Sequence, residues 1–378
     1  MHVIAAVAGF LLILTILIDG FETVVQPRRV TRRYRISRVY FGSFWAIWRY
    51  IAREWIGHSK RRAGFLSAFG PLSLLGLFFT WVAGLVLGFG LLHCGLRDPI
   101  FVTSGPSNEY LSTYIYLSGT TFFTLGYGDV TPITRLGRVL AVLESGLGFG
   151  FLAAILSYLP ALFQAFSKRE VDISLLDARA GSPPTAAQFI VRSASAPDHA
   201  SIDSFLAEWE RWAAELLESQ LSFPVLGFYR SQHDNQSWLA ALTTVLDTCA
   251  VRMTQLRDIN TFQSQMTFAM ARHAAVDLAL VLRAPRRENS DRLTAEQFNA
   301  LRQALRDAKL PLIENEPREE ALRNLRSTYE PFLQALGERL LLNVPPIIAN
   351  PVPDNWQRSA WMKPTPGIGE ISSERHFE

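Results

Sequence analysis

The sequence contains little cysteine and little charge for its 378 residues. Its two cysteines, Cys94 and Cys249, lie far apart in the chain, which excludes a disulfide framework and leaves packing as their expected role. Charged residues make up 19% of the chain, whereas soluble domains carry about 25%. With 49% hydrophobic residues, this composition excludes a disordered chain and an ordinary cytosolic enzyme.

The shortage of charge is concentrated in the first part of the chain. Residues 1–166 contain 14 Lys or Arg and 7 Asp or Glu, whereas residues 167–378 contain 23 and 27. Three stretches of the first part are apolar enough for membrane helices, which need about 20 residues. They are Val3–Ile18, which extends to Val25 and makes residues 1–25 the first span, Phe69–Leu92 and Val139–Phe166. The sequence therefore predicts a membrane part followed by a part of ordinary soluble composition.

The segment between the first two spans, residues 26–68, is strongly basic. It contains eleven Lys or Arg against one acid, Glu54, and such loops stay cytoplasmic. The N-terminus and residues 93–135 are then outside, and everything after about residue 167 is cytoplasmic, in a multi-pass protein of the cell membrane. Aromatic residues recur at helical spacing over Tyr40–Ile56, which favours an amphipathic helix along the inner leaflet. Packing of this helix against the next span is the alternative.

The outer loop contains a segment that enters the membrane without crossing it. Tyr110–Pro132 reads YLSTYIYLSGTTFFTLGYGDVTP and begins with a helical run over residues 110–123, for which Asn108 is a candidate N-cap. This run is too short to span a bilayer. Non-helical backbone at membrane depth is tolerated only where it is buried or lines a cavity. The segment after the short helix is therefore predicted to be a pore loop.

The pore loop Thr124–Asp129 has the composition that binds a dehydrated cation. Backbone carbonyls replace hydration water only if they all point to one side, and glycine permits the positive φ angles that this requires, at Gly126 and Gly128. Thr124 adds a hydroxyl oxygen at the inner end. Tyr127 has a ring that can brace the loop from outside, and Asp129 can hold the loop through a hydrogen bond to the pore helix.

The order of outer helix (69–93), pore helix (110–123), filter (124–129) and inner helix (135–166) resembles the potassium channel family with a two-helix pore. The segment TLGYGD is similar to the TVGYG filter of that family, with Leu125 in place of valine. The resemblance implies that K+ is the permeant ion and that no other cofactor is needed. It implies K+ coordination in the filter, at Thr124, Leu125, Gly126 and Tyr127. Because one chain supplies one filter strand and the ring needs four, it also implies a homotetramer.

The inner helix carries candidate gating and pore-lining residues. Gly148 resembles the gating hinge of the family, and a packing glycine is the alternative. Steps of four from Gly148 reach Leu152, Leu156 and Pro160, which would share one face and line the inner cavity. Pro160 removes a helical hydrogen bond and is expected to kink the helix. We expect the gate to be a constriction near residues 156–160.

Glu144 is the one ionisable residue deep in the inner helix. An intramembrane carboxyl group is a functional candidate by default. Two roles are open: it faces the cavity and attracts cations, or it forms a hydrogen bond with the pore-helix threonines Thr120 and Thr121. We favour the second role, which makes Glu144 a candidate modulatory residue.

The part after the inner helix is predicted to be helical. Residues 180–187 (AGSPPTAA) read as a linker, residues 180–343 as a cytoplasmic helical bundle, and the Pro-rich tail 344–378 as extended and partly disordered. Apolar residues recur at helical intervals in five segments: Ser201–Gln220, Ser237–Arg257, Gln263–Leu282, Thr294–Asp307 and Arg318–Leu342. The sequence has no βαβ alternation and no GxGxxG, which argues against a nucleotide-binding regulatory domain.

Several polar residues interrupt the apolar runs of this bundle: Asp247, Arg252, Arg272, His273 and Asp277. A site for an unknown cytoplasmic ligand at these residues, or at the loop Phe223–Asn235 with Tyr229, Arg230 and His233, is one hypothesis. The alternative is that these polar groups form hydrogen bonds and ion pairs within the bundle and bind no ligand. No catalytic constellation indicates an enzyme. Because acidic residues balance the basic residues, the bundle lacks the excess of positive charge that binds nucleic acid.

Together these features predict an all-α membrane protein. Its expected core is the outer helix–pore helix–filter–inner helix unit, with an extra N-terminal span and a helical bundle. The expected function is K+ conduction across a lipid bilayer by a homotetramer, with gating modulated by the bundle. Two alternatives are a non-selective cation channel of the same architecture, and a membrane-anchored sensor or scaffold with a vestigial pore.

Overall fold

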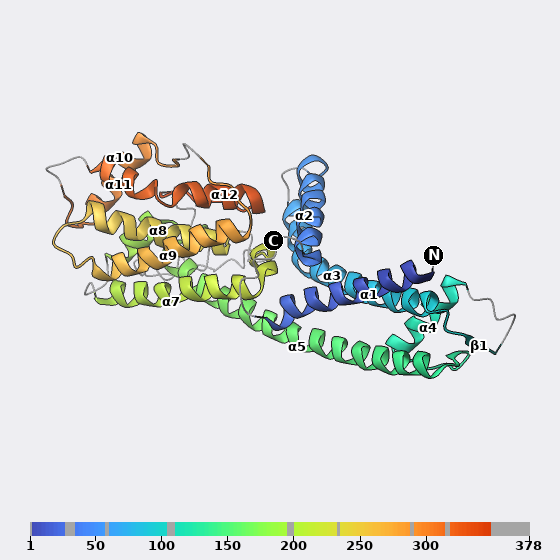
Figure 1. Cartoon of the computed structure of the whole chain (residues 1–378). Coiled ribbons are helices and arrows are strands. Elements are labelled where there is room, and N and C mark those ends of the chain that lie inside the picture. Colours follow the sequence, from blue (N-terminus) through green and yellow to red (C-terminus); the bar gives the residue numbers. More distant parts are fainter. Residues whose placement is uncertain are drawn as a thin grey trace, which may run out of the picture. The chain divides into compact units, whose positions relative to one another are not determined.

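The computed structural model shows an α-helical membrane protein. It describes the following residues: 2–26, 35–56, 60–103, 110–194, 200–232, 235–287, 291–313 and 318–348. The chain falls into two compact units, residues 1–164 and 165–378 (Figure 1). Among these described residues, three helices are long and apolar enough to span a membrane. The predicted fold class is confirmed. The basic run at residues 28–33, Asn108 and His233 lie outside the described residues.

The first and second spans pack along each other in unit 1. Helix α1 (His2–Gly20) continues as a π-helical turn (Phe21–Val25) and lies against α3 (Lys60–Gly95). A Cβ atom on Gly9 would come within 2.5 Å of the Gly88 carbonyl oxygen, so small residues set this close approach. Helix α3 begins nine residues before the predicted outer helix. The charged residues at its start are good helix formers although they are poor membrane residues.

Helix α2 (Ile36–Glu54) covers the N-terminal part of α3 with aromatic side chains. Trp45 is buried, and the ring of Trp48 stacks on Phe65 with 4.2 Å between ring centroids. One face of α2 therefore packs against the next span, α3, as the alternative for this segment predicted. Val39 and Ile47 are exposed on the other face. Contact of that second face with the inner leaflet stays a prediction.

A short helix and a pair of strands complete unit 1. Helix α4 (Leu111–Phe122) packs against α3. Strands β1 (Ile100–Val102) and β2 (Val130–Pro132) pair antiparallel, with Ile100 opposite Pro132. The sequence patterns did not predict this pairing because each strand has only three residues. The two strands hold together the segments that precede α4 and follow the candidate filter.

The third span, α5 (Arg135–Ala180), is longer than the predicted inner helix. It remains an α-helix through Pro160 and for fourteen residues beyond the expected end at 166. The linker prediction for residues 180–187 is wrong. Ala180 and Ala187 are buried, and the Thr185 side chain caps α6 (Ala186–Ser193) by accepting a hydrogen bond from the Gln188 N–H. The two prolines of this stretch form a packed turn rather than a flexible connection.

Unit 2 is a helical bundle around α8, which is buried over almost its whole length (Figure 1). After α6, its helices are α7 (Ala200–Ser222), α8 (Trp238–Gln255), α9 (Phe262–Val281), α10 (Ala295–Asp307), α11 (Glu319–Arg326) and α12 (Glu330–Leu340), with a 3-10 helix η2 (Pro224–Phe228). One long helix was expected over 318–342, and the chain instead breaks at residues 327–329. The start of the predicted tail is packed: Ile347 is buried and its carbonyl accepts the Ala187 N–H, while residues 342–346 form neither helix nor strand.

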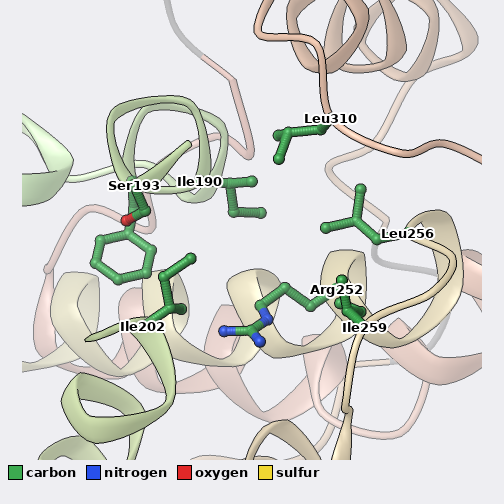
Figure 2. Close-up of a pocket in the computed structure, with 8 residues that line it drawn as sticks. Ile190, Ser193, Ile202, Arg252, Leu256, Ile259 and Leu310 are labelled. Atoms are coloured by element: carbon green, nitrogen blue, oxygen red, sulfur yellow. The ribbon is translucent and has the colours of Figure 1, made fainter. Parts of the chain in front are cut away.

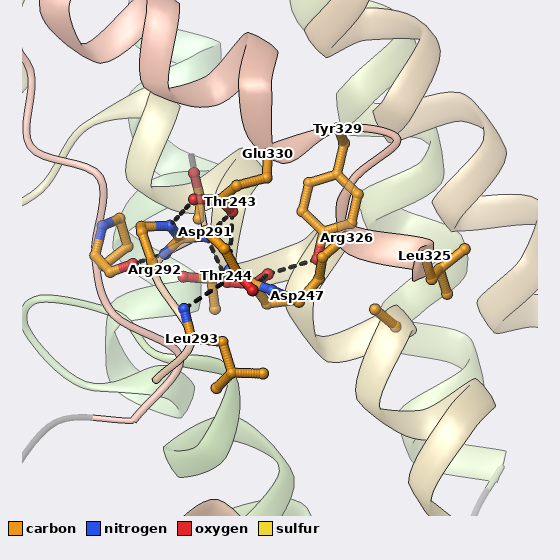
Figure 3. A network of polar contacts seen from close by, with 12 residues as sticks. Thr243, Thr244, Asp247, Asp291, Arg292, Leu293, Leu325, Arg326, Tyr329 and Glu330 are labelled. Atoms are coloured by element: carbon orange, nitrogen blue, oxygen red, sulfur yellow. Dashed lines mark hydrogen bonds and ion pairs between the residues drawn. The ribbon is translucent and has the colours of Figure 1, made fainter. Parts of the chain in front are cut away.

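A buried network of charged residues joins α8, α11 and α12 to the segment before α10 (Figure 3). Arg326 donates to Asp247 at 2.6 Å and to Glu330 at 3.0 Å, and Arg292 donates to the same two carboxylates at 3.0 and 2.6 Å. The Tyr329 hydroxyl donates to Asp247 at 2.6 Å. Burial and the Asp247 carboxylate raise the pKa of Tyr329 well above its ordinary value. Two arginines thus neutralise two carboxylates inside the bundle.

Candidate functional site

The backbone after α4 alternates between two conformations. Helix α4 ends at Phe122, and φ is positive at every second residue that follows: +57° at Thr124, +58° at Gly126 and +75° at Gly128. In an ordinary strand, successive carbonyls point to opposite sides. Left-handed conformations at alternate residues turn successive carbonyls towards one side. Glycine adopts them freely, whereas Thr124 is held in its strained angle by its surroundings.

Hydrogen bonds from the loop back to α4 fix its inner end. The Leu125 N–H donates to the Thr120 carbonyl at 2.8 Å, and the Thr124 N–H donates to the Thr121 carbonyl at 3.0 Å. Among the described residues, the carbonyl oxygens of 124–127 accept no hydrogen bond. The N–H groups at the start of the loop are therefore used inside the chain, whereas the row of carbonyl acceptors is left for a ligand. The C-terminal end of α4, with its negative dipole, points to the same place.

Asp129 fixes the outer end of the loop. Its carboxylate accepts a hydrogen bond from the hydroxyl of Tyr116 in α4 at 2.8 Å. The expected tie between Asp129 and the pore helix is therefore present. The Asp129 carbonyl also accepts the Thr103 N–H at 2.9 Å, which continues the β1–β2 pairing. The loop is thus held at both ends and open between them.

The loop is uncovered in the single chain. Residues 123–128 are exposed, including 53% of Leu125 and 68% of Tyr127. The Tyr127 ring has no aromatic or hydrogen-bonding partner among the described residues, so the brace expected from it is not made within one chain. An apolar side chain and a row of carbonyl oxygens are thus uncovered in the single chain.

Asp98 joins three helices behind this loop, and the sequence patterns gave no indication of it. Its carboxylate accepts the Thr134 hydroxyl at 2.5 Å and lies 3.2 Å from His93 Nδ1, while its carbonyl accepts the Tyr114 hydroxyl at 2.9 Å. These partners lie in or beside α3, α4 and α5. The one available signal was an acid directly after the apolar run of α3, and it does not indicate a partner.

Gly148 packs against the end of α4. It is buried, and a Cβ atom there would overlap the Phe122 carbonyl oxygen. Close packing therefore accounts for the lack of a side chain here, and α5 runs through Gly148 without interruption, while a hinge at this residue stays a prediction. Leu152, Leu156 and Pro160 are exposed on α5, whereas Gly148 is not. The structure does not bring Gly148 together with those three residues on one open face.

Glu144 lies behind the candidate filter, fully buried between α5 and α4. Its carboxyl group contacts the hydroxyl of Ser118, which lies 2.8 Å from the Val86 carbonyl of α3. The expected partners Thr120 and Thr121 were wrong: Thr120 donates instead to the Leu117 carbonyl at 3.0 Å. Ser118 is therefore the residue of α4 that points to Glu144 in α5.

The predicted ligand residues of unit 2 are not brought together. His273 and Asp277 form an exposed pair with 3.5 Å between nitrogen and oxygen. Arg230 donates to the carbonyls of Leu340 and Leu341, both at 2.9 Å, which is a helix-capping role. The described residues contain no group of three side chains suited to hold a metal ion.

These features define the class as a membrane protein with a re-entrant pore loop between two spans. The model of a family described as "Ion channel" matches residues 75–165. Protein LctB of Geobacillus stearothermophilus is 34% identical over 95 residues, which cover 23% of this chain and 69% of that protein. The chain belongs to this ion channel family. No solved structure matches it.

A second relative extends the similarity beyond the pore. The uncharacterized membrane protein YdjJ of Bacillus subtilis (strain 168) is 27% identical over 190 residues. The match covers 50% of this chain and 54% of YdjJ, so the chain spans about half the length of that relative.

Proposed function

We propose that this chain is one subunit of a homotetrameric, potassium-selective channel. The observation that carries the proposal is the alternation of positive φ angles at Thr124, Gly126 and Gly128, together with the unoccupied carbonyls of residues 124–127. A row of aligned carbonyl oxygens replaces the water around a dehydrated cation. The TLGYGD sequence is the form of this row that favours K+ over Na+.

The exposed loop supports assembly from four copies. One chain holds one TLGYG segment, and a closed ring of carbonyls takes four. In the tetramer, neighbouring copies of the chain bury the Leu125 and Tyr127 side chains, which are exposed in the single chain. The lipid bilayer covers the remaining apolar surface of the three spans.

Helix α5 is the proposed link between the pore and unit 2. Leu152, Leu156 and Pro160 line the inner cavity in this proposal, with the gate near residues 156–160. Beyond them, Arg169 is buried and donates to the carbonyls of Leu226 and Tyr229 at 2.9 and 3.0 Å. A movement of η2 within unit 2 is therefore passed to α5. Unit 2 lies in the cytoplasm if the basic segment 26–68 does.

K+ flux through reconstituted protein tests this proposal. Purified protein in liposomes is expected to carry K+ and to give a bi-ionic reversal potential that excludes Na+. Gly126→Ala should abolish the flux, because alanine is strained at φ +58°. Gly146→Ala is the matched control, since nothing lies within 4 Å of a Cβ at that position.

Two other outcomes identify the alternatives. Equal permeation of Na+ and K+ indicates a non-selective cation channel. A folded protein without any flux, unaffected by Gly126→Ala, indicates a membrane-anchored sensor or scaffold. A monomeric mass in detergent and in lipid nanodiscs refutes the tetramer.

A further inference from the structure

Helix α9 of unit 2 is apolar on two opposite faces. Its inner face packs against α7 and α8. Four small or apolar residues of this inner face are buried: Ala271, Ala274, Ala275 and Leu278. The outer face exposes Phe262 (62%), Met266 (38%) and Leu280 (64%). A helix that is apolar all round is normally buried all round, so the outer face of α9 lacks a partner within the chain.

The outer face of α7 in the same unit has a different character. It exposes Glu208, Arg211 and Glu218, as expected of a helix face in water. A cavity beside Arg252 (Figure 2) does not account for the outer face of α9 either. That cavity has only about 10 Å³, which is room for one water molecule, and no residue of α9 lines it. The outer face of α9 is thus neither a typical solvent face nor the wall of that cavity.

The residues of this outer face recur at alternating steps of four and three along α9. They form the seam of α9: Phe262, Met266, Ala269, His273, Val276 and Leu280. These steps make the a/d repeat by which two helices pack against each other. Ala269 and His273 are exposed and Val276 is half-buried, so the seam lies along the outer side of the helix. His273 is its one polar member, and a single polar residue at such a position fixes the register of a helix pair.

The charges beside the seam match a parallel pair of α9 helices. In a parallel pair, a flanking residue of one helix lies next to the residue five positions later in the other helix. Arg272 and Asp277 flank the seam and are five positions apart, so opposite charges meet. Arg272 uses its Nε donor for the Thr328 carbonyl at 3.2 Å, and a guanidinium group has five N–H donors. An antiparallel pair would instead bring the two Arg272 side chains, which have like charges, towards each other.

A membrane surface matches this face less well than a second helix does. Helices that lie on a membrane carry Lys and Arg beside their apolar stripe. The residues that flank the seam include one base and one acid: Gln263, Gln265, Met270, Arg272, Asp277 and Ala279. A second copy of the chain presents the same seam with the same flanking charges, and it is therefore the partner that fits best.

We propose that the seam of α9 packs in parallel against the same seam of a second copy of this chain. The exposed Phe262, Met266 and Leu280 side chains are buried in the pair, and Arg272 pairs with the partner's Asp277. Because α9 is already folded in the bundle, the pair forms without the cost of nucleating a free helix. In the proposed tetramer this gives two pairs of unit 2, but the pairing does not rest on the proposed function, since two copies are enough for it.

Disulfide cross-linking of the full chain in lipid nanodiscs tests the pairing. Cys94→Ala serves as the background, because the other cysteine, Cys249, is buried. Each residue of a parallel seam lies opposite its own copy. Ala269→Cys and Leu280→Cys should therefore both form a cross-linked dimer when copper phenanthroline is added as the oxidant. Ala214→Cys replaces an exposed alanine of α7 and is the matched control, which should form no such dimer.

Charge reversal tests the contact between Arg272 and the partner's Asp277. Arg272→Glu, added to Ala269→Cys, places like charges across the pair. It should slow cross-linking about threefold to tenfold, which is the effect of losing two exposed ion pairs. Asp277→Arg combined with Arg272→Glu exchanges the two charges and should restore the original rate. Arg211→Glu, on the exposed face of α7, should leave the rate unchanged.

Several outcomes would overturn the proposal. Equal cross-linking of Ala269→Cys and Ala214→Cys refutes the interface, and cross-linking of Ala269→Cys without that of Leu280→Cys refutes the parallel arrangement. No recovery in the double charge reversal refutes the ion pair. If Ala269→Cys is not cross-linked and a water-soluble maleimide labels it in detergent but not in nanodiscs, the seam lies on the membrane, which also refutes the pairing.

The mass of the assembly separates this proposal from the proposed function. Tetramers in which Ala269→Cys does not cross-link refute the pairing of α9 and leave the tetrameric pore intact. Cross-linked dimers without tetramers support the pairing and refute the tetramer.

Discussion

Replacement of Arg326 by methionine tests whether the buried charge network holds unit 2 together. Arg326 is 1% exposed and contacts three carboxylates: Asp247 at 2.6 Å, Glu330 at 3.0 Å and Asp291 at 3.1 Å. Arg326→Met keeps a side chain of similar length but leaves Asp247 and Glu330 to share one arginine, Arg292. The network then holds one buried negative charge in excess.

The expected cost follows from that excess charge. Breaking a buried ion pair by removing one partner costs about 3–5 kcal/mol. Because Arg292 and Tyr329 still donate to Asp247, we expect the lower end, about 3 kcal/mol. Arg323→Met is the matched control. Arg323 also pairs with Asp291, but its side chain is 35% exposed, so its loss should cost less than about 1 kcal/mol.

Hydrogen exchange of α8 in the full chain measures this difference. The amides of α8 are buried at the centre of the bundle, and their exchange reports the opening of unit 2. A loss of 3 kcal/mol should speed exchange on the order of a hundredfold in Arg326→Met. Asp247→Asn combined with Arg326→Met removes the excess charge and should recover part of the protection. Equal exchange in Arg326→Met and Arg323→Met would refute the reasoning.

Three further predictions concern the filter, the packing of α5 and the pH dependence of unit 2. Tyr116→Phe removes the hydroxyl that donates a hydrogen bond to Asp129. K+ flux through this variant should decline faster during a recording than flux through the control Tyr110→Phe. An equal decline in both variants would show that this hydrogen bond does not stabilise the filter. Gly148→Ala places a methyl group against the Phe122 carbonyl and should cost about 1–3 kcal/mol, seen as a lower melting temperature than that of Gly146→Ala. Burial alone would raise the pKa of Asp291, but the Leu293 N–H and the charges of Arg326 and Arg323 outweigh it and lower that pKa. Because its pKa is lowered by folding, Asp291 stabilises unit 2 above about pH 4, and this contribution is lost as the pH falls further. In Asp291→Asn, the free energy of unfolding of unit 2 should therefore fall less steeply on the acid side of a pH–stability curve.

The sequence by itself determined the spans and the pore loop, because both depend on local properties. Hydropathy over some 20 residues marks a membrane helix wherever it packs. The glycines of TLGYGD permit positive φ angles irrespective of their neighbours, and the structure has such angles at both Gly126 and Gly128. The segments predicted to be helical from Ser237 and from Thr294 begin at those residues in the structure, where each side chain caps its helix.

Only the tertiary structure decided which distant residues meet. Glu144 pairs with Ser118 rather than Thr120, Gly148 lies against Phe122, and Arg252 of α8 donates to Asp203 of α7. The buried turn at residues 180–187 has the composition of a linker and became part of the core. The contacts between helices depend on the rotation and offset of one helix against another. Hydrophobic periodicity gives the face that is buried, but it does not give the partner that the face meets.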